Sequence, residues 1–201
     1  MIAKNIAKYR MSEVIGAISQ KLAGASMRPG RVSKELRLDV TTTSQGGFPT
    51  WTTIKLGTHE SVGDLSSAIM NSGMGISYWA VDILKTITLV SVKTQLELVR
   101  VSVHDLGLKG EAMRAQIYLH AMKNGLRLVP SETGPQLRWQ YANQASDELL
   151  LVGMEPILDS GREPCVFGVV HNQAGRCLYA YSNPIERLWR PDSQWVFGHQ
   201  S

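Results

Sequence analysis

Cysteine and long apolar runs are scarce in this chain of 201 residues. Its two cysteines, Cys165 and Cys177, are too few for the disulfide framework of a small secreted protein. No stretch approaches the ~20 apolar residues that a membrane-spanning helix requires. Residues 1–22 also lack the unbroken apolar segment of a signal peptide. We therefore expect a cytoplasmic protein without a membrane span.

The sequence signatures of several enzyme and nucleotide-binding classes are missing as well. The chain contains no GxxxxGK[ST] run, no GxGxxG turn after a strand, no HExxH, no GxSxG and no pair of CxxC motifs. It also lacks the regular alternation of strands and helices that is typical of doubly wound nucleotide-binding folds. The sequence consequently indicates no cofactor, and it leaves open whether the protein is an enzyme.

One group of potential metal ligands needs a geometric test, namely Cys165, His171 and Cys177. If the residues from Asn172 to Gly175 form a hairpin turn, Cys177 lies opposite Val170, near the end of the first strand. At ~3.3 Å per residue the two sulfurs are then ~15–20 Å apart, too far for a shared zinc ion or a disulfide. We predict no metal site and two unpaired thiols.

Basic residues are concentrated at the N-terminus, although the net charge of the whole chain is only +4. Residues 1–47 carry a charge of +5, whereas the remaining residues hold 13 basic and 14 acidic groups. Such an arm is typical of proteins that contact phosphates or an acidic protein surface. The alternative is a solvated leader that contacts nothing. The candidate residues for nucleic-acid or partner binding are Lys4, Lys8, Arg10, Lys21, Arg28, Arg31, Lys34 and Arg37.

The arm also contains a helical pattern, with apolar residues at Met11, Ile15, Ile18 and Leu22. This stripe must be buried against the rest of the chain, a second copy of the protein or another partner. Gly24 and Pro29 end the pattern, and residues 41–47 have the composition of a linker. We predict a basic arm over residues 1–47 that can form a homo-oligomer through its helix, followed by one globular domain over residues 48–201.

The pattern of the domain predicts an α+β fold, in which a mostly antiparallel sheet packs against two to three helices behind an N-terminal helical arm. Ser61 is expected to cap the first helix, and a break at Gly73 divides it from the pattern that continues to Leu84. A further helix is expected over residues 110–124. Strands are predicted over residues 51–56, 86–92, 96–103, 148–152, 165–170, 176–181 and 194–198, the second and third as a hairpin.

The densest cluster of polar chemistry lies in residues 131–141, where the period fits a helix and a strand equally well. Further along the chain, Glu155 has apolar neighbours on both sides, so we expect it to be buried and paired with Arg138. The alternative is a pocket in which a carboxylate acts as an acid or base and an arginine binds an anion. Its candidate catalytic residues are Glu132, Arg138, Tyr141 and Glu155.

A resemblance rests on three segments: residues 130–141, residues 154–157 and the terminal run of residues 195–197. Together they resemble a group of uncharacterised bacterial hypothetical proteins, over approximately Trp51 to Gly198. The resemblance implies no activity, so it transfers no catalytic role to any position. The basic arm lies outside it.

Two functional hypotheses follow from the sequence. The first is a non-catalytic binding or regulatory protein whose basic arm contacts nucleic acid or an acidic partner. The second is a small hydrolase or toxin-like enzyme with a pocket of glutamate, arginine and tyrosine side chains. They differ in whether the polar groups of residues 131–155 are sealed in the fold or open into a cleft.

Overall fold

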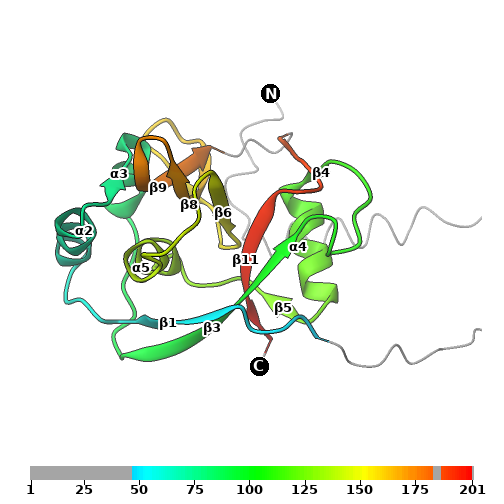
Figure 1. The fold of residues 1–201 in the computed structure, drawn as a ribbon, viewed down its shortest axis with the longest axis horizontal. Helices are drawn as coiled ribbons and strands as arrows, with labels where there is room; N and C mark the ends of the chain where they lie inside the picture. The colour runs from blue at the N-terminus through cyan, green and yellow to red at the C-terminus, as the bar shows by residue number, and fades with distance from the viewer. Residues whose placement is uncertain (1–46, 183–186, 201) are drawn as a thin grey trace, which may run out of the picture. The chain divides into compact units, whose positions relative to one another are not determined.

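The structure, a computed structural model, describes residues 47–182 and 187–200. Its elements follow the order shown in Figure 1. The helices are α2 (Val62–Asn71), α3 (Tyr78–Leu84), α4 (Arg114–Lys123) and α5 (Thr133–Gln140). The strands are β1 (Thr52–Leu56), β2 (Gly75–Ile76), β3 (Thr94–Ser102), β4 (Ala112–Met113), β5 (Leu126–Arg127), β6 (Glu148–Val152), β7 (Ile157–Leu158), β8 (Pro164–Asn172), β9 (Gly175–Ser182), β10 (Leu188–Trp189) and β11 (Gln194–His199).

Nine of these strands form one curled, mostly antiparallel sheet. Its main path runs β1-β3-β11-β6-β8-β9-β2, with β5 paired to β11 and β7 paired to β8. Among the strand pairs of the described residues, only β11–β6 and β2–β9 are parallel. Strands β4 and β10 form a separate two-stranded sheet. The protein therefore has a mixed α/β fold in which antiparallel pairing dominates.

The central strands are buried on both faces, which explains why their sequences are almost continuously apolar. On β11, Val196 belongs to the main hydrophobic core, whereas its neighbours Trp195 and Phe197 are buried outside that core. On β6, Leu150 likewise belongs to the main core, whereas Leu151 is buried outside it. Successive side chains of a strand point to opposite faces of a sheet. The sheet thus separates two apolar layers.

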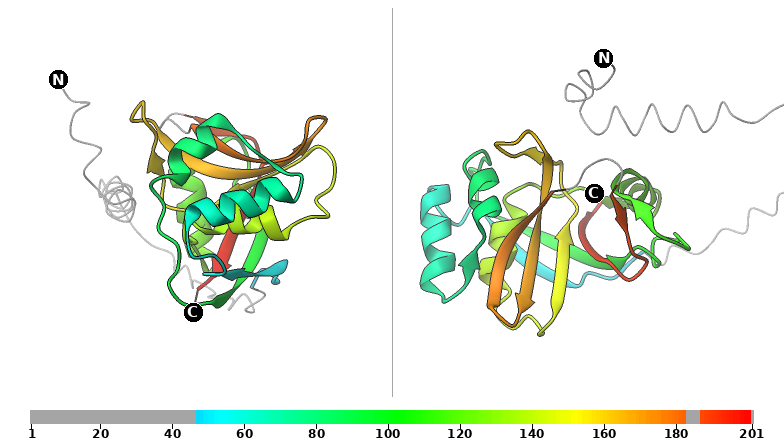
Figure 2. Two further views of the ribbon diagram at one scale, coloured as in Figure 1. Left: turned by 90° about the vertical axis from the view of Figure 1, so that its left-hand side faces the viewer. Right: turned by 90° about the horizontal axis from the view of Figure 1, so that it is seen from above.

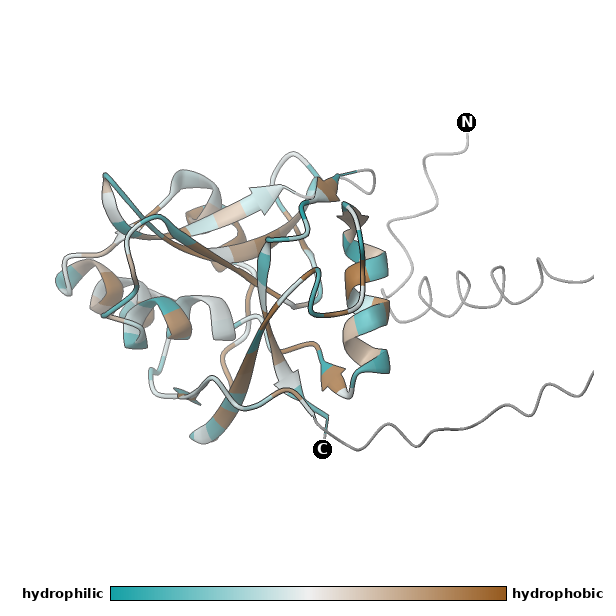
Figure 3. Ribbon diagram, turned by 45° about the vertical axis from the view of Figure 1, so that its right-hand side comes forward, coloured by the Kyte–Doolittle hydropathy of each residue, from teal (hydrophilic) through white to brown (hydrophobic). Residues whose placement is uncertain are grey.

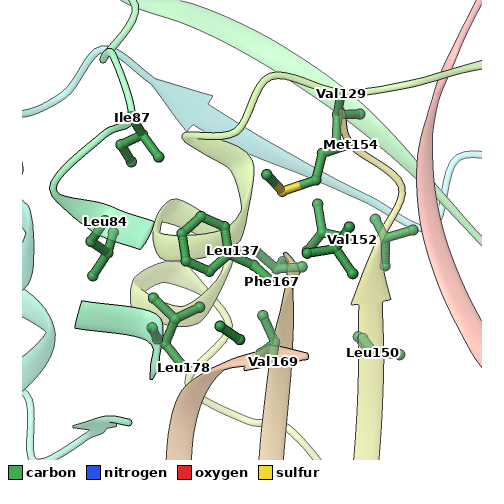
Figure 4. Packing of buried hydrophobic residues seen from close by; sticks show 14 of the residues in the cluster. Leu84, Ile87, Val129, Leu137, Leu150, Val152, Met154, Phe167, Val169 and Leu178 are labelled. Carbon is green, nitrogen blue, oxygen red and sulfur yellow. The ribbon is translucent and has the colours of Figure 1, made fainter. Parts of the chain in front are cut away.

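Helices α2, α3 and α5 cover one side of the sheet, as Figure 2 shows. Figure 4 shows the centre of the main core, where Leu137 of α5 packs among Phe167, Val169 and Leu178 of β8 and β9. The helix approaches β8 so closely that a Cβ atom on Gly134 would lie 2.5 Å from the Cβ of Phe167. Glycine is therefore required at this position of α5.

Helix α4 lies on the other side of the sheet from α2 and α3. Figure 3 shows apolar and polar residues alternating along it, as expected for a helix with one buried face. Its Tyr118 is fully buried and makes edge-to-face contacts with Trp195 and Phe197, at centroid distances of 5.8 and 5.9 Å. The Tyr118 hydroxyl donates to the carbonyl of Met154 at 2.8 Å, so its polar atom is satisfied.

Most of the predicted elements of the domain are confirmed. Ser61 caps α2 by accepting a hydrogen bond from the amide of Asp64, and the turn after Ser72 separates α2 from α3. The helix predicted over residues 110–124 is α4, and Gly125 follows it with a φ of +74°. The described residues contain four helices rather than two to three, because residues 133–140 are helical as well.

The hairpin predicted from residues 86–92 and 96–103 is wrong. Residues 86–92 form no strand, and β3 pairs with β1 and β11 instead. The β-branched run is held in an irregular path because it packs against Gly57, where an added Cβ would lie 2.7 Å from the carbonyl oxygen of Val90. This packing against Gly57 is a contact between distant segments, which local strand propensity does not predict.

Residues 1–46 lie outside the described residues, and so do the predicted arm helix and nearly all of the linker. The arm, its boundary with the domain and an oligomer formed through its helix stay predictions. In the ranges that the structure covers, no helix has the length and apolar character needed to cross a membrane.

Candidate functional site

Glu132, at the start of α5, connects three parts of the domain. Its side chain is fully buried. Oε1 accepts hydrogen bonds from the amide of Gly57 and from Nε2 of Gln136, both at 2.8 Å, and Oε2 accepts from the amide of Val90 at 2.6 Å. The glutamate thereby holds the loop after β1 and the irregular 86–92 segment against the helix. Its carboxylate is used entirely within the fold.

Gly134 and Pro135 lie inside the first turn of α5, which begins at Thr133. Proline is tolerated there because the first amides of a helix have no partner within the helix. The helix then continues through Leu137, which settles the choice between helix and strand that the sequence left open.

Arg138 is fully buried at the other end of α5. Its Nη1 donates to Oε1 of Gln144 and, at 3.1 Å, to the carbonyl of Val170; its Nη2 donates to the carbonyl of Tyr141 at 2.5 Å. Burial, with a smaller contribution from the charge of Arg176, lowers the pKa of Arg138 to about 10. The guanidinium joins the end of α5 to β8 and to the loop before β6.

The predicted buried ion pair between Glu155 and Arg138 is wrong. Glu155 is exposed, and Arg138 is bound by amide and carbonyl groups instead. The reason lies in the chain path: β6 ends at Val152, and the amide of Met154 bonds back to the carbonyl of Val152 at 3.0 Å. This tight turn directs Glu155 to the surface although its neighbours in the sequence are apolar.

Tyr141 belongs to a partly exposed polar cluster, which we call the Arg100 cluster: Trp51, Arg100, Tyr141 and Glu148. Arg100 forms an ion pair with Glu148, and its Nε donates to Oε1 of Gln194 at 3.1 Å. The guanidinium carbon lies 6.0 Å from the centre of the Trp51 ring, and that ring packs edge-to-face against Tyr141 at 5.1 Å. Burial, followed by the adjacent Glu148 carboxylate, raises the pKa of Tyr141.

The Arg100 cluster lies between two surface pockets. One has a volume of about 320 Å³ and is lined by Trp51 and Tyr141, together with residues of β1 and the end of α5. The other has a volume of about 490 Å³ and is lined by Arg100 and Glu148, together with residues 146–151 and 190–194. Both volumes fall within the range of ~300–1,000 Å³ that is usual for ligand sites. Partial exposure and charged groups make this the candidate functional site.

These two pockets do not bring the four predicted catalytic residues together. Tyr141 lines the smaller pocket, whereas Glu132, Arg138 and Glu155 line neither of the two. Sequence reasoning missed Trp51, Arg100 and Glu148. A signal was present for Arg100, because a single arginine stands between Val99 and Val101 in an otherwise apolar strand. A charged side chain in such a strand must pair or reach solvent, and Arg100 does both.

The hairpin geometry predicted for the cysteines is confirmed. Val170 pairs with Cys177, and Cys165 pairs with Ser182 five positions further along the same ladder. Both thiols are free. Burial, reinforced by Asp159, raises the pKa of Cys165 to about 12, so this thiol stays protonated. Over residues 47–182 and 187–200, no group of three histidine, cysteine, aspartate or glutamate side chains is placed to bind a metal ion.

The eight basic arm residues lie outside the described residues, so their predicted role in binding is untested. Comparison of the chain with models of known protein families, with curated proteins and with solved structures finds no match. The resemblance to uncharacterised bacterial proteins likewise stays a prediction.

Proposed function

We propose that this chain is a non-catalytic binding protein in the cytoplasm whose basic arm contacts nucleic acid. The observation that carries the proposal is that Glu132 and Arg138 form their hydrogen bonds inside the fold. Both side chains are fully buried, and their partners are amide and carbonyl groups of neighbouring segments. Groups held in this way stabilise a scaffold, and they have no access to a substrate.

The charge distribution supports nucleic acid as the partner. The arm carries +5, whereas the rest of the chain is close to neutral. Lysine and arginine residues that neutralise phosphates release counterions, which favours binding at low salt. The two free thiols are typical of proteins in a reducing compartment, which supports the cytoplasmic location.

The alternative, a small hydrolase or toxin-like enzyme, has less support. It requires Glu132, Arg138, Tyr141 and Glu155 around one substrate, and only Tyr141 lines a described pocket. An enzyme built on the Arg100 cluster would need a nucleophile or a free base, and its glutamate is already paired with the arginine.

The test of the proposal measures binding of the full chain to duplex DNA and to single-stranded RNA over a salt series. The arm variant carries Lys8→Gln, Arg28→Gln and Arg31→Gln. If all three residues contact phosphates of duplex DNA, the slope of log K against log salt falls by about 2–3, at about 0.9 per contact. The affinity of the arm variant for duplex DNA at low salt should fall as well.

A matched control removes the same charge from the domain through Lys93→Gln, Lys109→Gln and Lys123→Gln, all at exposed positions. We expect this variant to retain the salt slope of the parent protein. Equal slopes for the arm variant and the parent would refute the arm as the site of contact. Equal losses in both triple variants would show that net charge alone governs binding.

A further inference from the structure

One edge of strand β1 is unpaired. Strand β1 lies at the end of the sheet path and pairs with β3 alone, so within the described part of the chain no strand adjoins its other edge. An open edge presents amide and carbonyl groups that can form hydrogen bonds with an additional strand. Figure 1 shows β1 beside β3, with α5 nearby.

The side chain of Gln140 already occupies one position along this edge. Its Oε1 accepts from the amide of Lys55 at 2.9 Å, and its Nε2 donates to the carbonyl of Lys55 at 2.8 Å. The carboxamide thus pairs with both main-chain groups of Lys55, as a residue of a neighbouring strand would. These bonds establish that the main chain of Lys55 faces away from β3.

The same direction applies to Thr53, because main-chain groups of alternate residues in a strand point to the same side. Thr53 is exposed, and it lines the smaller pocket between β1 and the end of α5. Its amide and carbonyl are therefore directed into a groove. The Gln140 carboxamide already fills the position at Lys55, so an added strand must pair at Thr53.

The chemistry of the groove indicates what could bind there. Its volume is about 320 Å³, and none of its lining residues is charged: Trp51, Thr52, Thr53, Ile54, Leu137, Gln140, Tyr141 and Asn143. A charged group in the groove would lose hydration without gaining an opposite charge. Trp51 and Tyr141 instead offer two ring surfaces to an apolar or aromatic side chain.

We propose that the β1 edge binds a short, extended peptide of a partner protein as an added strand. The peptide pairs with the main chain of Thr53, and the residues that enter the groove are uncharged, with one side chain against Trp51 and Tyr141. A single strand fits a groove bounded on its far side by Leu137, Gln140 and Asn143. The edge strand of a second folded copy would bring further strands against that wall. This surface is separate from the arm and does not depend on nucleic-acid binding.

The probe for this proposal is the capped heptapeptide Ser-Thr-Val-Tyr-Val-Thr-Ser, added at about 1 mM to the full-length, ¹⁵N-labelled protein. We expect shifts of the amide signals of Thr53, Gln140 and Asn143, and at least about tenfold slower exchange of the Thr53 amide with solvent. Peptides with leucine or threonine at the central position should bind as well. Lysine or glutamate there should weaken binding at least about tenfold.

A peptide with N-methyl groups on its two valines and central tyrosine keeps every side chain but loses the central amide donors. Strand addition predicts at least about tenfold weaker binding of this peptide. In the protein, Thr53→Pro removes the outward amide without removing a bond to β3, and Thr53→Val is the matched control that keeps the amide. If Thr53→Pro does not fold, Asn143→Trp at the exposed rim blocks the groove instead.

Several results would overturn the proposal. The first is that none of the three uncharged peptides binds. The second is that the N-methylated peptide binds as tightly as the unmethylated one. The third is that the amide signals that shift belong only to residues away from β1 and α5. Binding that survives both Thr53→Pro and Asn143→Trp would also exclude this edge. A concentration-dependent dimer that Asn143→Trp abolishes would assign the edge to a second copy of the chain and thereby contradict the proposal.

Discussion

Replacement of Glu132 by glutamine tests whether its carboxylate stabilises the fold or serves catalysis. The change keeps the size and shape of the side chain but replaces one acceptor oxygen by an NH₂ donor. Oε1 accepts two hydrogen bonds, from Gly57 and Gln136, and Oε2 accepts one from Val90. The glutamine side chain keeps the most hydrogen bonds when its oxygen accepts from the amide of Gly57. Its NH₂ group then faces the amide of Val90.

The expected cost follows from that arrangement. A hydrogen bond to a charged acceptor contributes about 1.5–3 kcal/mol, and an amide left without an acceptor costs about 1–3 kcal/mol. Rotation of Gln136 cannot compensate, because its Oε1 accepts from Thr58 at 3.1 Å and from Gln140 at 2.9 Å. We expect Glu132→Gln to lower the free energy of unfolding by about 3 kcal/mol.

Urea unfolding provides the measurement. With an m-value of about 2 kcal/mol/M, the midpoint should fall by about 1.5 M while m stays constant. Hydrogen exchange should accelerate most at Val90, because its amide loses its acceptor. The control is Glu60→Gln at an exposed position, which should change stability by less than about 0.5 kcal/mol. A Glu132→Gln protein at least as stable as the parent would refute the structural role, since catalytic groups often reduce stability.

Two further predictions concern α5 and the turn after β3. Gly134→Ala should destabilise the domain by about 1–3 kcal/mol in urea, because the new methyl overlaps Phe167, whereas Gly110→Ala has open space and should not. A stable Gly134→Ala protein would mean that α5 does not approach β8 this closely. Hydrogen bonds from the hydroxyl and amide of Ser102 lower the pKa of Asp105, so its contribution to stability is present above the ordinary value of 3.8 and declines as pH falls below it. Asp105→Asn should flatten the pH dependence of stability below about pH 4, and an unchanged profile would contradict this.

Local patterns predicted the elements whose partners are close in sequence. The turn at Asn172–Gly175 placed Cys177 opposite Val170, and the ladder has this register. The serine before α2 was identified because a helix cap depends on a few adjacent residues. In each case the determining interaction lies within a few positions along the chain.

Interactions between distant segments could not be predicted in this way. The run from Thr86 to Val92 has the composition of a strand, but the carboxylate of Glu132, 42 positions beyond Val90, accepts its amide hydrogen. Strand β1 pairs with β3 across an intervening pair of helices. Glu155 was placed in the core from its neighbours, and a turn of the main chain moved it to the surface. Tertiary contacts decided the first two cases, and a tight turn of the main chain decided the third.

The same distinction applies to the candidate site. Residues 131–141 concentrate polar groups because the helix must connect segments that have few backbone partners of their own, and buried amides require acceptors. If such a group had to release its partners to reach a substrate, the energy barrier would rise by several kcal/mol. A ligand can bind without breaking hydrogen bonds of the fold where side chains contact each other and still leave one face exposed. Trp51 and Tyr141 are of this kind, since they contact each other and still line an open pocket.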